Sequence, residues 1–438
     1  MAGGFRLFLA VWLGQAISLL GSRVSRLALG VWLYQRTGAV TDFALIALCD
    51  ALPVLALMPF TGAVADRYDK RKVMLLADVV SALCMLTVAG LIASGRFQYW
   101  HLYLAVLAGA SASALQSPAW SAAMVQLVSR EQVGRSVGMV QASEGMAAIF
   151  APALAGGLLA ATGIMGALLF DFATFAIGAS VLVLVRFPLQ PTASGPAPTA
   201  GTVWREIGAG LSYVLSRPGL LALLVLSSSV ALCVVAVEVL VPPMLLAQYS
   251  PTVMGWVLSA AGLGAVCGSV AMSAWGGPRR KMDGLLGAGA LLGLMLMVAG
   301  ATSSPLVLAV SGWAAMFCVP LVWGCSHTIW QLELPFELQG RVAGLRRMVG
   351  EAAALTGLLG AGPLTDHVLE PAMAPGGALS GSMGLLLGIG RGRGIGLLFV
   401  LLGLGLVITM ALGRASRRLY RVEDGSPPAP APAMLESR

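Results

Sequence analysis

Among the ionisable residues inside long apolar stretches of this 438-residue chain, five stand out: Arg23, Arg26, Asp50, Glu144 and Glu238. A charged side chain at the centre of a bilayer costs about 2.5–3.5 kcal/mol on insertion scales, so it is retained mainly where it lines a cavity or has a partner. A carboxyl group in a low-dielectric environment can take up and release a proton near neutral pH. We therefore predict that the two arginines and Asp50 bind substrate and that Glu144 and Glu238 carry protons.

The spacing of these residues predicts a pairing. Arg23 and Arg26 are three residues apart and share one face of the first apolar stretch. At 1.5 Å per residue, Arg26 and Asp50 each lie about 12 Å below the outer surface, on two consecutive stretches. An Arg26–Asp50 ion pair is geometrically plausible, either as part of a site or only as a brace between helices. With Asp50 as the sole nearby anion, one positive charge is left over, which favours neutral or anionic amphiphilic ligands.

A dense charge cluster, TGAVADRYDKRK, interrupts the apolar sequence at residues 61–72. Gly62 and Asp66 are four residues apart and share a helix face, and glycine lets a neighbouring helix approach closely. Asp66 falls at a helix C-terminus, where a carboxylate needs a cation or another helix's N-terminus nearby. We expect a conformational latch between Asp66 and either a basic residue or the start of the stretch at 342–368; the alternative is a turn whose charges only fix topology. The gating residues predicted here are Gly62, Asp66, Arg67, Lys70, Arg71, Arg130 and Arg135.

Two further acidic residues are expected to have local roles. Asp78 follows the charge cluster and is expected to pair with it, and Asp171 is expected to hold local structure. The cysteines form no C-x-x-C pair, the three histidines are scattered, and the sequence contains no nucleotide-binding Gly-rich loop. No catalytic or metal-ligand constellation stands out, so we expect no enzyme, no cofactor and no metal.

Twelve apolar stretches are long enough to cross a bilayer, which takes about 20 residues. The chain is 58% hydrophobic and only 11% charged, against about 25% charged residues in soluble proteins. If both termini are cytoplasmic, the external segments hold only four basic residues, Arg36, Arg96, Arg391 and Arg393. This asymmetry predicts that topology and explains the net charge of +8 without nucleic-acid binding. The predicted spans are 7–34, 42–66, 73–94, 98–128, 135–161, 164–186, 212–248, 252–275, 283–301, 304–331, 342–368 and 395–413.

The domain organisation follows from a Pro/Gly/Ser-rich segment near the middle of the chain. We predict an N-terminal bundle at 1–187, a cytoplasmic linker at 188–206, a C-terminal bundle at 207–418 and a disordered tail at 419–438. A Gly-Arg pair before the fifth span recurs before the eleventh, which is typical of an internal duplication. The sequence thus predicts an all-α membrane protein of twelve transmembrane helices in two pseudo-symmetric six-helix bundles, as a monomer.

The cluster at 61–72 resembles the signature loop of the major facilitator superfamily, which links transmembrane helices two and three. The segments VWLYQRTG (31–38), GRV (340–342), AGPLTD (361–366) and GRGIG (392–396) are similar to a bacterial branch that contains macrolide efflux proteins and the enterobactin exporter. The resemblance implies the major facilitator fold in a bacterial inner membrane. It also implies alternating access and proton-driven export of an amphiphilic small molecule, such as a drug, siderophore or peptide natural product.

One element departs from this resemblance. Antiporters of the superfamily carry Gly-Pro-x-x-Gly-Gly in the fifth span, where this chain has APALAGG at 151–157. Pro152 and Gly156 remain and are predicted to take part in gating, because small residues permit close helix packing. The departure leaves open an importer or facilitator of the same fold. A third alternative is a non-transporting membrane scaffold for biosynthetic partners, in which the embedded charges would be dispensable.

Overall fold

A computed structural model describes residues 2–129, 132–185, 211–334, 336–416 and 419–420, and this part of the chain is helical with no strand. The first group of helices is α1 (Ala2–Thr37), α2 (Val40–Arg67), α3 (Lys70–Ala93), α4 (Tyr99–Leu127) and α5 (Val133–Leu184). The second group is α7 (Pro218–Leu246), α8 (Pro251–Trp275), α9 (Lys281–Ala301), α10 (Pro305–Glu333), α11 (Phe336–Leu364) and α14 (Arg393–Ala415). Between α11 and α14 lie a π-helix η2 (Thr365–Leu369) and two short helices, α12 (Glu370–Met373) and α13 (Met383–Leu387).

Helix boundaries follow local sequence signals. Proline occupies the first turn of α7, α8 and α10, where its missing N–H is no loss. The Asp69 side chain caps α3 by accepting a hydrogen bond of 3.0 Å from the backbone of Arg71. Gly163 has φ 66° and ψ −165°, a conformation that favours glycine, and it divides α5 into two arms.

Nine helices of the described residues are long and apolar enough to cross a membrane: α1, α2, α3, α5, α7, α8, α9, α10 and α14. The remaining predicted spans correspond to α4, α11 and the second arm of α5. Apolar side chains all around a helix are expected where every face meets lipid or another helix. The predicted all-α membrane fold is therefore confirmed.

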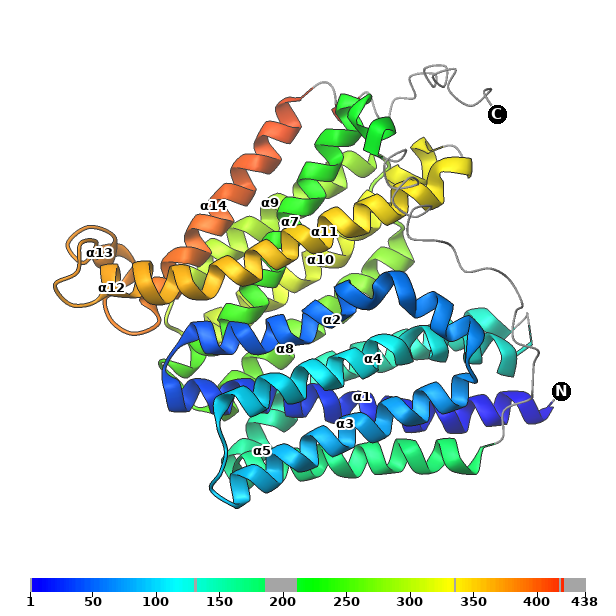
Figure 1. The fold of residues 1–438 in the computed structure, drawn as a ribbon. Coiled ribbons are helices and arrows are strands. Elements are labelled where there is room, and N and C mark those ends of the chain that lie inside the picture. Colours follow the sequence, from blue (N-terminus) through cyan, green and yellow to red (C-terminus); the bar gives the residue numbers. More distant parts are fainter. Residues whose placement is uncertain (1, 130–131, 186–210, 335, 417–418, 421–438) are drawn as a thin grey trace.

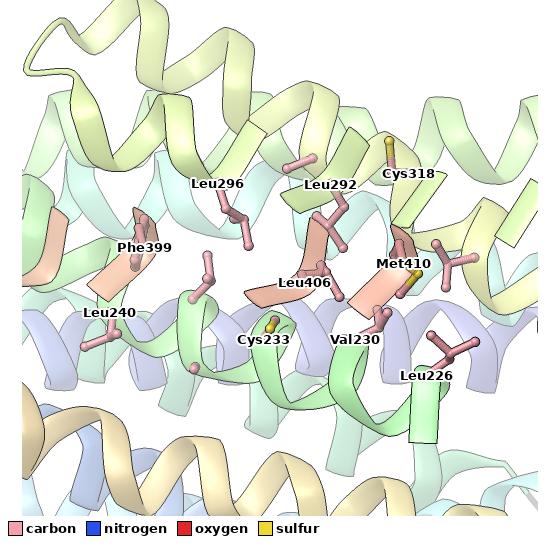
Figure 2. Packing of buried hydrophobic residues seen from close by; sticks show 14 of the residues in the cluster. Leu226, Val230, Cys233, Leu240, Leu292, Leu296, Cys318, Phe399, Leu406 and Met410 are labelled. Carbon is pink, nitrogen blue, oxygen red and sulfur yellow. The ribbon is translucent and has the colours of Figure 1, made fainter. Parts of the chain in front are cut away.

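The helices pack in two halves. In the N-terminal half, α1 packs on α5, and α4 lies against α2 and α3; in the C-terminal half, α10 lies against α8 and α9, α14 against α9, and α7 against α11. The C-terminal half has a continuous apolar core that includes Leu226, Val230, Leu292, Leu406 and Met410 (Figure 2). The two halves meet mainly where α5 contacts α8 and α2 contacts α11.

The bundle has two ends, which we name by the course of α1. The near face is where α1 begins and α14 ends, and the far face is where α1 ends and α14 begins (Figure 1). The helices of the two halves lie close together toward the far face and diverge toward the near face in that view. The predicted linker at 188–206 lies outside the described residues, and so does the predicted tail apart from residues 419 and 420. Leu419 is buried, and the Tyr420 hydroxyl donates a 2.8 Å hydrogen bond to Asp283, so packing continues two residues into that predicted tail.

Candidate functional site

Two ion pairs join α1 to its neighbours deep within the helices. The guanidinium of Arg26 reaches both carboxylate oxygens of Asp50 on α2, at 3.0 and 2.9 Å. The guanidinium of Arg23 binds the carboxylate of Glu144 on the first arm of α5. The Arg26–Asp50 pair is the one that the equal depths of the two residues predict, and it is confirmed.

The partner of Arg23 corrects a prediction. The sequence led us to expect Asp50 as the sole anion near two arginines, with one positive charge left over. That expectation was wrong, because α1 packs along α5 and brings Glu144 to Arg23 across 121 residues of sequence. The argument for an anionic ligand, which rested on the surplus cation, loses its basis.

Glu238 adds a third carboxylate to this region, from the other half. It lies on α7, eight residues before the far end of that helix, at a depth of about 12 Å. Its carboxylate interacts electrostatically with Arg23, which places it across from the Arg23–Glu144 pair. Within the described residues, Glu238 makes no hydrogen bond and no ion pair of its own. Three carboxylates therefore face two guanidinium groups, and we call these five residues the charge cluster of the site.

Four of the five side chains in the charge cluster are partly exposed rather than buried. The side chains of Arg23 and Glu144 are 40% and 44% exposed, and those of Arg26 and Asp50 are 38% and 35% exposed. An ion pair with this degree of exposure contributes little to stability, about 0–1 kcal/mol. Such pairs can exchange partners at low cost, as a binding or proton-coupling site requires.

Buried polar contacts hold α1 in place around the cluster. Asp171 is 1% exposed and accepts a 2.5 Å hydrogen bond from the hydroxyl of Ser25, so it holds local structure as predicted. Arg26 is oriented by a second contact, in which its Nε donates to the carbonyl of Ser22 at 3.1 Å. A guanidinium that is anchored at two places presents a fixed geometry to a partner.

Among the side chains that the structure describes, Asp78 pairs with two glutamines and not with Lys70, Arg71 or Lys72 of the basic loop, contrary to the prediction. It is 1% exposed and accepts hydrogen bonds from the side-chain amides of Gln116, at 2.8 Å, and Gln15, at 3.4 Å. Gln116 also donates to Gln15 at 2.9 Å, so the three side chains join α1, α3 and α4. Its position after a charged loop was a misleading signal, because Asp78 lies about two turns into α3, where its side chain is already buried within the half.

The far face is closed by Asp366, whose role the sequence did not reveal. Its carboxylate accepts hydrogen bonds from the backbone N–H groups of Val40, at 3.0 Å, and Thr41, at 2.7 Å, and from the Thr41 hydroxyl, at 2.7 Å. A carboxylate at a helix N-terminus satisfies free N–H groups and complements the helix dipole. Asp366 belongs to the C-terminal half and α2 to the N-terminal half, so this cap ties the halves together. The signal in the sequence was an acidic residue at the end of the predicted eleventh span.

Glycines bring the halves into backbone contact on the same side. A Cβ on Gly156 would lie 2.4 Å from the carbonyl oxygen of Pro251, and a Cβ on Gly255 would lie 2.6 Å from that of Pro152. The predicted close approach at Pro152 and Gly156 is thus present, between α5 and α8. Gly157, the adjacent residue, has open space where its Cβ would be.

These neighbours provide a matched test. We expect Gly156→Ala to lower the melting temperature of the purified protein and to slow transport, because overpacking at a tight contact costs about 1–3 kcal/mol. Gly157→Ala should leave both unchanged. Intrinsic fluorescence melting in detergent measures stability for both variants, and equal melting curves would contradict a close α5–α8 contact at Gly156.

The predicted gating residues of the near face are only partly described. The side chains of Gly62, Asp66 and Arg67 and all of Arg130 lie outside the described residues, so the latch at Asp66 stays a prediction. Lys70 begins α3. Arg71 donates from its guanidinium to the carbonyls of Leu182 and Val183, each at 2.6 Å, and thereby caps the end of α5. Arg135 lies over the ring of Phe5, 5.2 Å from its centroid.

A pocket of about 730 Å³ opens on the far face beside the Asp366 cap. It lies between the end of α1, the end of α7 and the η2–α12 segment, and its lining includes Tyr34, Gln35, His367, Glu370 and Arg391. Burial raises the pKa of Glu370, and backbone N–H groups at the start of α14 partly offset this rise. The cap residues Val40, Thr41 and Asp366 also line this pocket, whereas no residue of the charge cluster does.

Comparison with known proteins places the architecture in a family. The sequence profile of the Major Facilitator Superfamily matches residues 11–358. Macrolide efflux protein A of Streptococcus pyogenes is 23% identical over 368 residues, which cover 82% of this chain and 90% of that protein. Multidrug efflux pump Tap of Mycolicibacterium fortuitum is 27% identical over 348 residues, covering 76% and 83%.

Solved structures show the same fold at low identity. The crystal structure of a bacterial homolog to the human lysosomal transporter Spinster, in an inward-facing and unoccupied conformation, has a TM-score of 0.70 at 15% identity and covers 97% of this chain and 99% of that one. A bacterial homologue of the iron transporter ferroportin, in an inward-facing state, has a TM-score of 0.66 at 14% identity, with coverages of 94% and 99%.

The resemblance at residues 61–72, the two packed halves and the family profile agree. The protein is a multi-pass inner-membrane transporter rather than an enzyme, and its relatives include efflux pumps. The chain belongs to the Major Facilitator Superfamily.

Proposed function

We propose that this chain exports an amphiphilic, drug-like small molecule by alternating access, in exchange for protons. The observation that carries the proposal is the charge cluster: two partly exposed ion pairs and, among the described residues, one unpaired carboxylate, between two halves that are closed at one face. The relatives named as a macrolide efflux protein and a multidrug efflux pump support a drug as the exported molecule. Siderophores and peptide natural products belong to the same amphiphilic class.

The closed face gives the proposal a direction. With both termini cytoplasmic, as the distribution of Lys and Arg favours, the far face is external and the near face is cytoplasmic. The structure then corresponds to a state that is closed to the outside by Asp366 and by the α5–α8 contact. Substrate would enter from the cytoplasm or inner leaflet, bind at the charge cluster and leave when the halves rock.

Proton coupling is proposed to run through Glu144 and Glu238. Protonation of Glu144 would remove the charge that holds Arg23, and Arg23 would then be free to pair with Glu238 of the other half. One proton would thereby move an ion pair from within the N-terminal half to the interface between the halves. The energy source would be the proton gradient, with no cofactor, and one chain would suffice for the cycle.

The near face needs a counterpart to the Asp366 cap. We propose that Asp66, at the end of α2, faces the start of α11 or a basic residue such as Arg135 when the near face closes. The far face shows the converse contact, since Asp366 follows α11 and caps the start of α2. The pair of helices α2 and α11 would then have an acidic latch at each of its two ends.

Drug accumulation in cells tests the direction of transport. We expect an efflux-deficient bacterium that expresses this chain to accumulate less of a macrolide and of ethidium than the same host with an empty vector. Asp50→Asn, which removes the anionic partner of Arg26, should restore accumulation at equal membrane expression. Higher accumulation with the wild-type chain would favour the importer, and unchanged accumulation of both probes would favour the scaffold; either result would contradict export.

A further inference from the structure

A segment without charge joins the eleventh helix of the fold to the last one at the far face. Residues 371–390 contain no Asp, Glu, Lys, Arg or His, although Glu370 and Arg391 flank them. About 25% of the residues in soluble proteins are charged, so a segment of this length in water would carry several charges. We propose that residues 371–390 form an interfacial anchor, whose exposed apolar side chains insert into the phospholipid leaflet at the far face.

The segment is folded against the C-terminal half. The backbone N–H of Leu379 donates to the carbonyl of Ala372 at 3.0 Å, and that of Gly390 donates to the carbonyl of Met373 at 3.3 Å. The side chain of Met373 is fully buried, and Leu379 packs against the apolar core of that half. Figure 1 shows α12 and α13 at the far face, beside the start of α14. The segment therefore has a defined position from which its side chains can meet a partner.

Apolar side chains of α13 and its surroundings form an exposed patch. Leu387 is buried in the core of the C-terminal half, which fixes one side of α13. Leu385 and Leu386 are 81% and 77% exposed, and Met383 and Ile389 are exposed beside them. Single exposed leucines are common on protein surfaces, but a contiguous group of apolar side chains marks an interaction site. We call these four exposed residues the α13 patch.

The position of the α13 patch favours lipid as its partner. α13 contacts both α9 and α14. These two helices each present a stripe of exposed apolar side chains at helical spacing, namely Leu291, Leu294 and Val298 on α9 and Leu401, Leu404 and Ile408 on α14. In an inner-membrane transporter such stripes face lipid. Val298 lies three residues before the end of α9, so the α13 patch continues a surface that the bilayer already covers.

The backbone of the segment limits how deeply it can insert. Irregular backbone is not tolerated among lipid acyl chains, because its N–H and C=O groups would have no hydrogen-bond partners there. Apart from α12 and α13, residues 371–390 are turns, bends and irregular structure. The segment is therefore expected among the lipid headgroups, with only its apolar side chains below them. Interfacial segments bury their apolar face about 5–10 Å into the boundary between headgroups and acyl chains.

A fluorophore at residue 386 measures this depth. In a cysteine-free background, Leu386→Cys is labelled with NBD, and the full-length chain is reconstituted in nanodiscs that hold one copy each. We expect lipids with a doxyl group near the headgroup to quench the label, and aqueous iodide to quench it at least about threefold less than a label at Ser94, because residue 386 lies about 5–10 Å inside the boundary. Ser94 is an exposed residue on the same face, between α3 and α4.

A double variant tests whether the α13 patch holds the segment in the leaflet. The NBD label is placed at Ile389→Cys, and Leu385 and Leu386 are both changed to serine. We expect iodide quenching of the label to rise at least about threefold, because the apolar groups that insert are lost. Leu306→Ser is the matched control, since Leu306 is 73% exposed at the start of α10 on the same face. It should leave the label unchanged, and melting curves verify that each variant is folded.

The outcomes separate lipid from the other partners that an apolar patch can have. Strong iodide quenching of the label at residue 386, without quenching by doxyl lipids, would overturn the anchor because the patch would then face water. Shielding that appears only in vesicles crowded with protein, and not in discs with one copy, would assign the patch to a second copy of the chain and also overturn the anchor. An unchanged label at Ile389→Cys in the double serine variant would contradict the role of the α13 patch. None of these results depends on whether the chain exports a drug.

Discussion

Asp366→Ala is expected to shift the protein toward a state that is open at the far face. The carboxylate accepts three hydrogen bonds from the start of α2. A hydrogen bond to a charged group contributes about 1.5–3 kcal/mol to stability when it is shielded from water. Asp366 is half-buried, so the free energy lost with its carboxylate is smaller than the sum of three such bonds. A loss of about 1.4 kcal/mol already changes the ratio of the two states tenfold.

Spin labels on the far face can measure this shift. Ser94, between α3 and α4, and Ser304, before α10, are exposed and belong to different halves. In a cysteine-free background, double electron–electron resonance between labels at these positions should give a dominant short distance in the wild type. Asp366→Ala should raise the fraction of a longer distance.

A matched control is available in the same turn of α2. Asp42 interacts with the Tyr103 hydroxyl at 3.1 Å, within the N-terminal half, and makes no described contact across the halves. Asp42→Ala should therefore leave the distance distribution as in the wild type. If the distance distribution of Asp366→Ala is identical to those of the wild type and Asp42→Ala, the cap does not hold the far face closed.

Arg23→Gln is expected to abolish transport, with a loss of at least about tenfold. Arg23 is the cation between Glu144 and Glu238, and its removal leaves two carboxylates without a partner in the middle of the helices. The two carboxylates that remain repel each other, and neither has the cation with which it would exchange partners. Arg36→Gln is the matched control, because Arg36 lies at the far end of the same helix, over the ring of Trp32.

A double variant separates charge balance from function. Arg23→Gln combined with Glu144→Gln removes one charge of each sign, so the melting temperature should return toward the wild-type value. Transport should stay low, because the partner exchange that couples the halves is lost. Recovery of full transport in the double variant would show that the Arg23–Glu144 pair serves only as a brace.

The depth of a residue along its helix could be predicted from the sequence, but the neighbouring helix that its side chain contacts could not. Arg26 and Asp50 lie on consecutive helices, so counting residues from the connecting turn was enough to pair them. Three helices, α2 to α4, lie between those of Arg23 and Glu144 in the sequence, and the contact of these two residues depends on which face of α5 meets α1. The same limit explains the wrong partner for Asp78, whose two glutamines lie on other helices.

Contacts between the halves also could not be predicted from the sequence. The segment that ends at Asp366 carried a family resemblance, but nothing in it indicated that the carboxylate reaches α2, more than 300 residues earlier. Gly156 was predicted to permit close packing, and the structure supplies the partner, the carbonyl of Pro251. Small and acidic residues were thus the sequence signal for these contacts between the halves, but only the tertiary structure identifies their partners.

Proton-driven transport in proteoliposomes tests the central claim most directly. The purified chain is reconstituted in vesicles with a fluorescent drug such as ethidium, and a pH gradient is imposed across the vesicle membrane. The account predicts that the gradient drives substrate against its concentration, and that Glu144→Gln and Glu238→Gln each lose this drive while substrate exchange without a gradient persists. The account would be contradicted if the rate of transport by the wild type did not depend on the pH gradient. It would also be contradicted if both variants responded to the gradient as fully as the wild type.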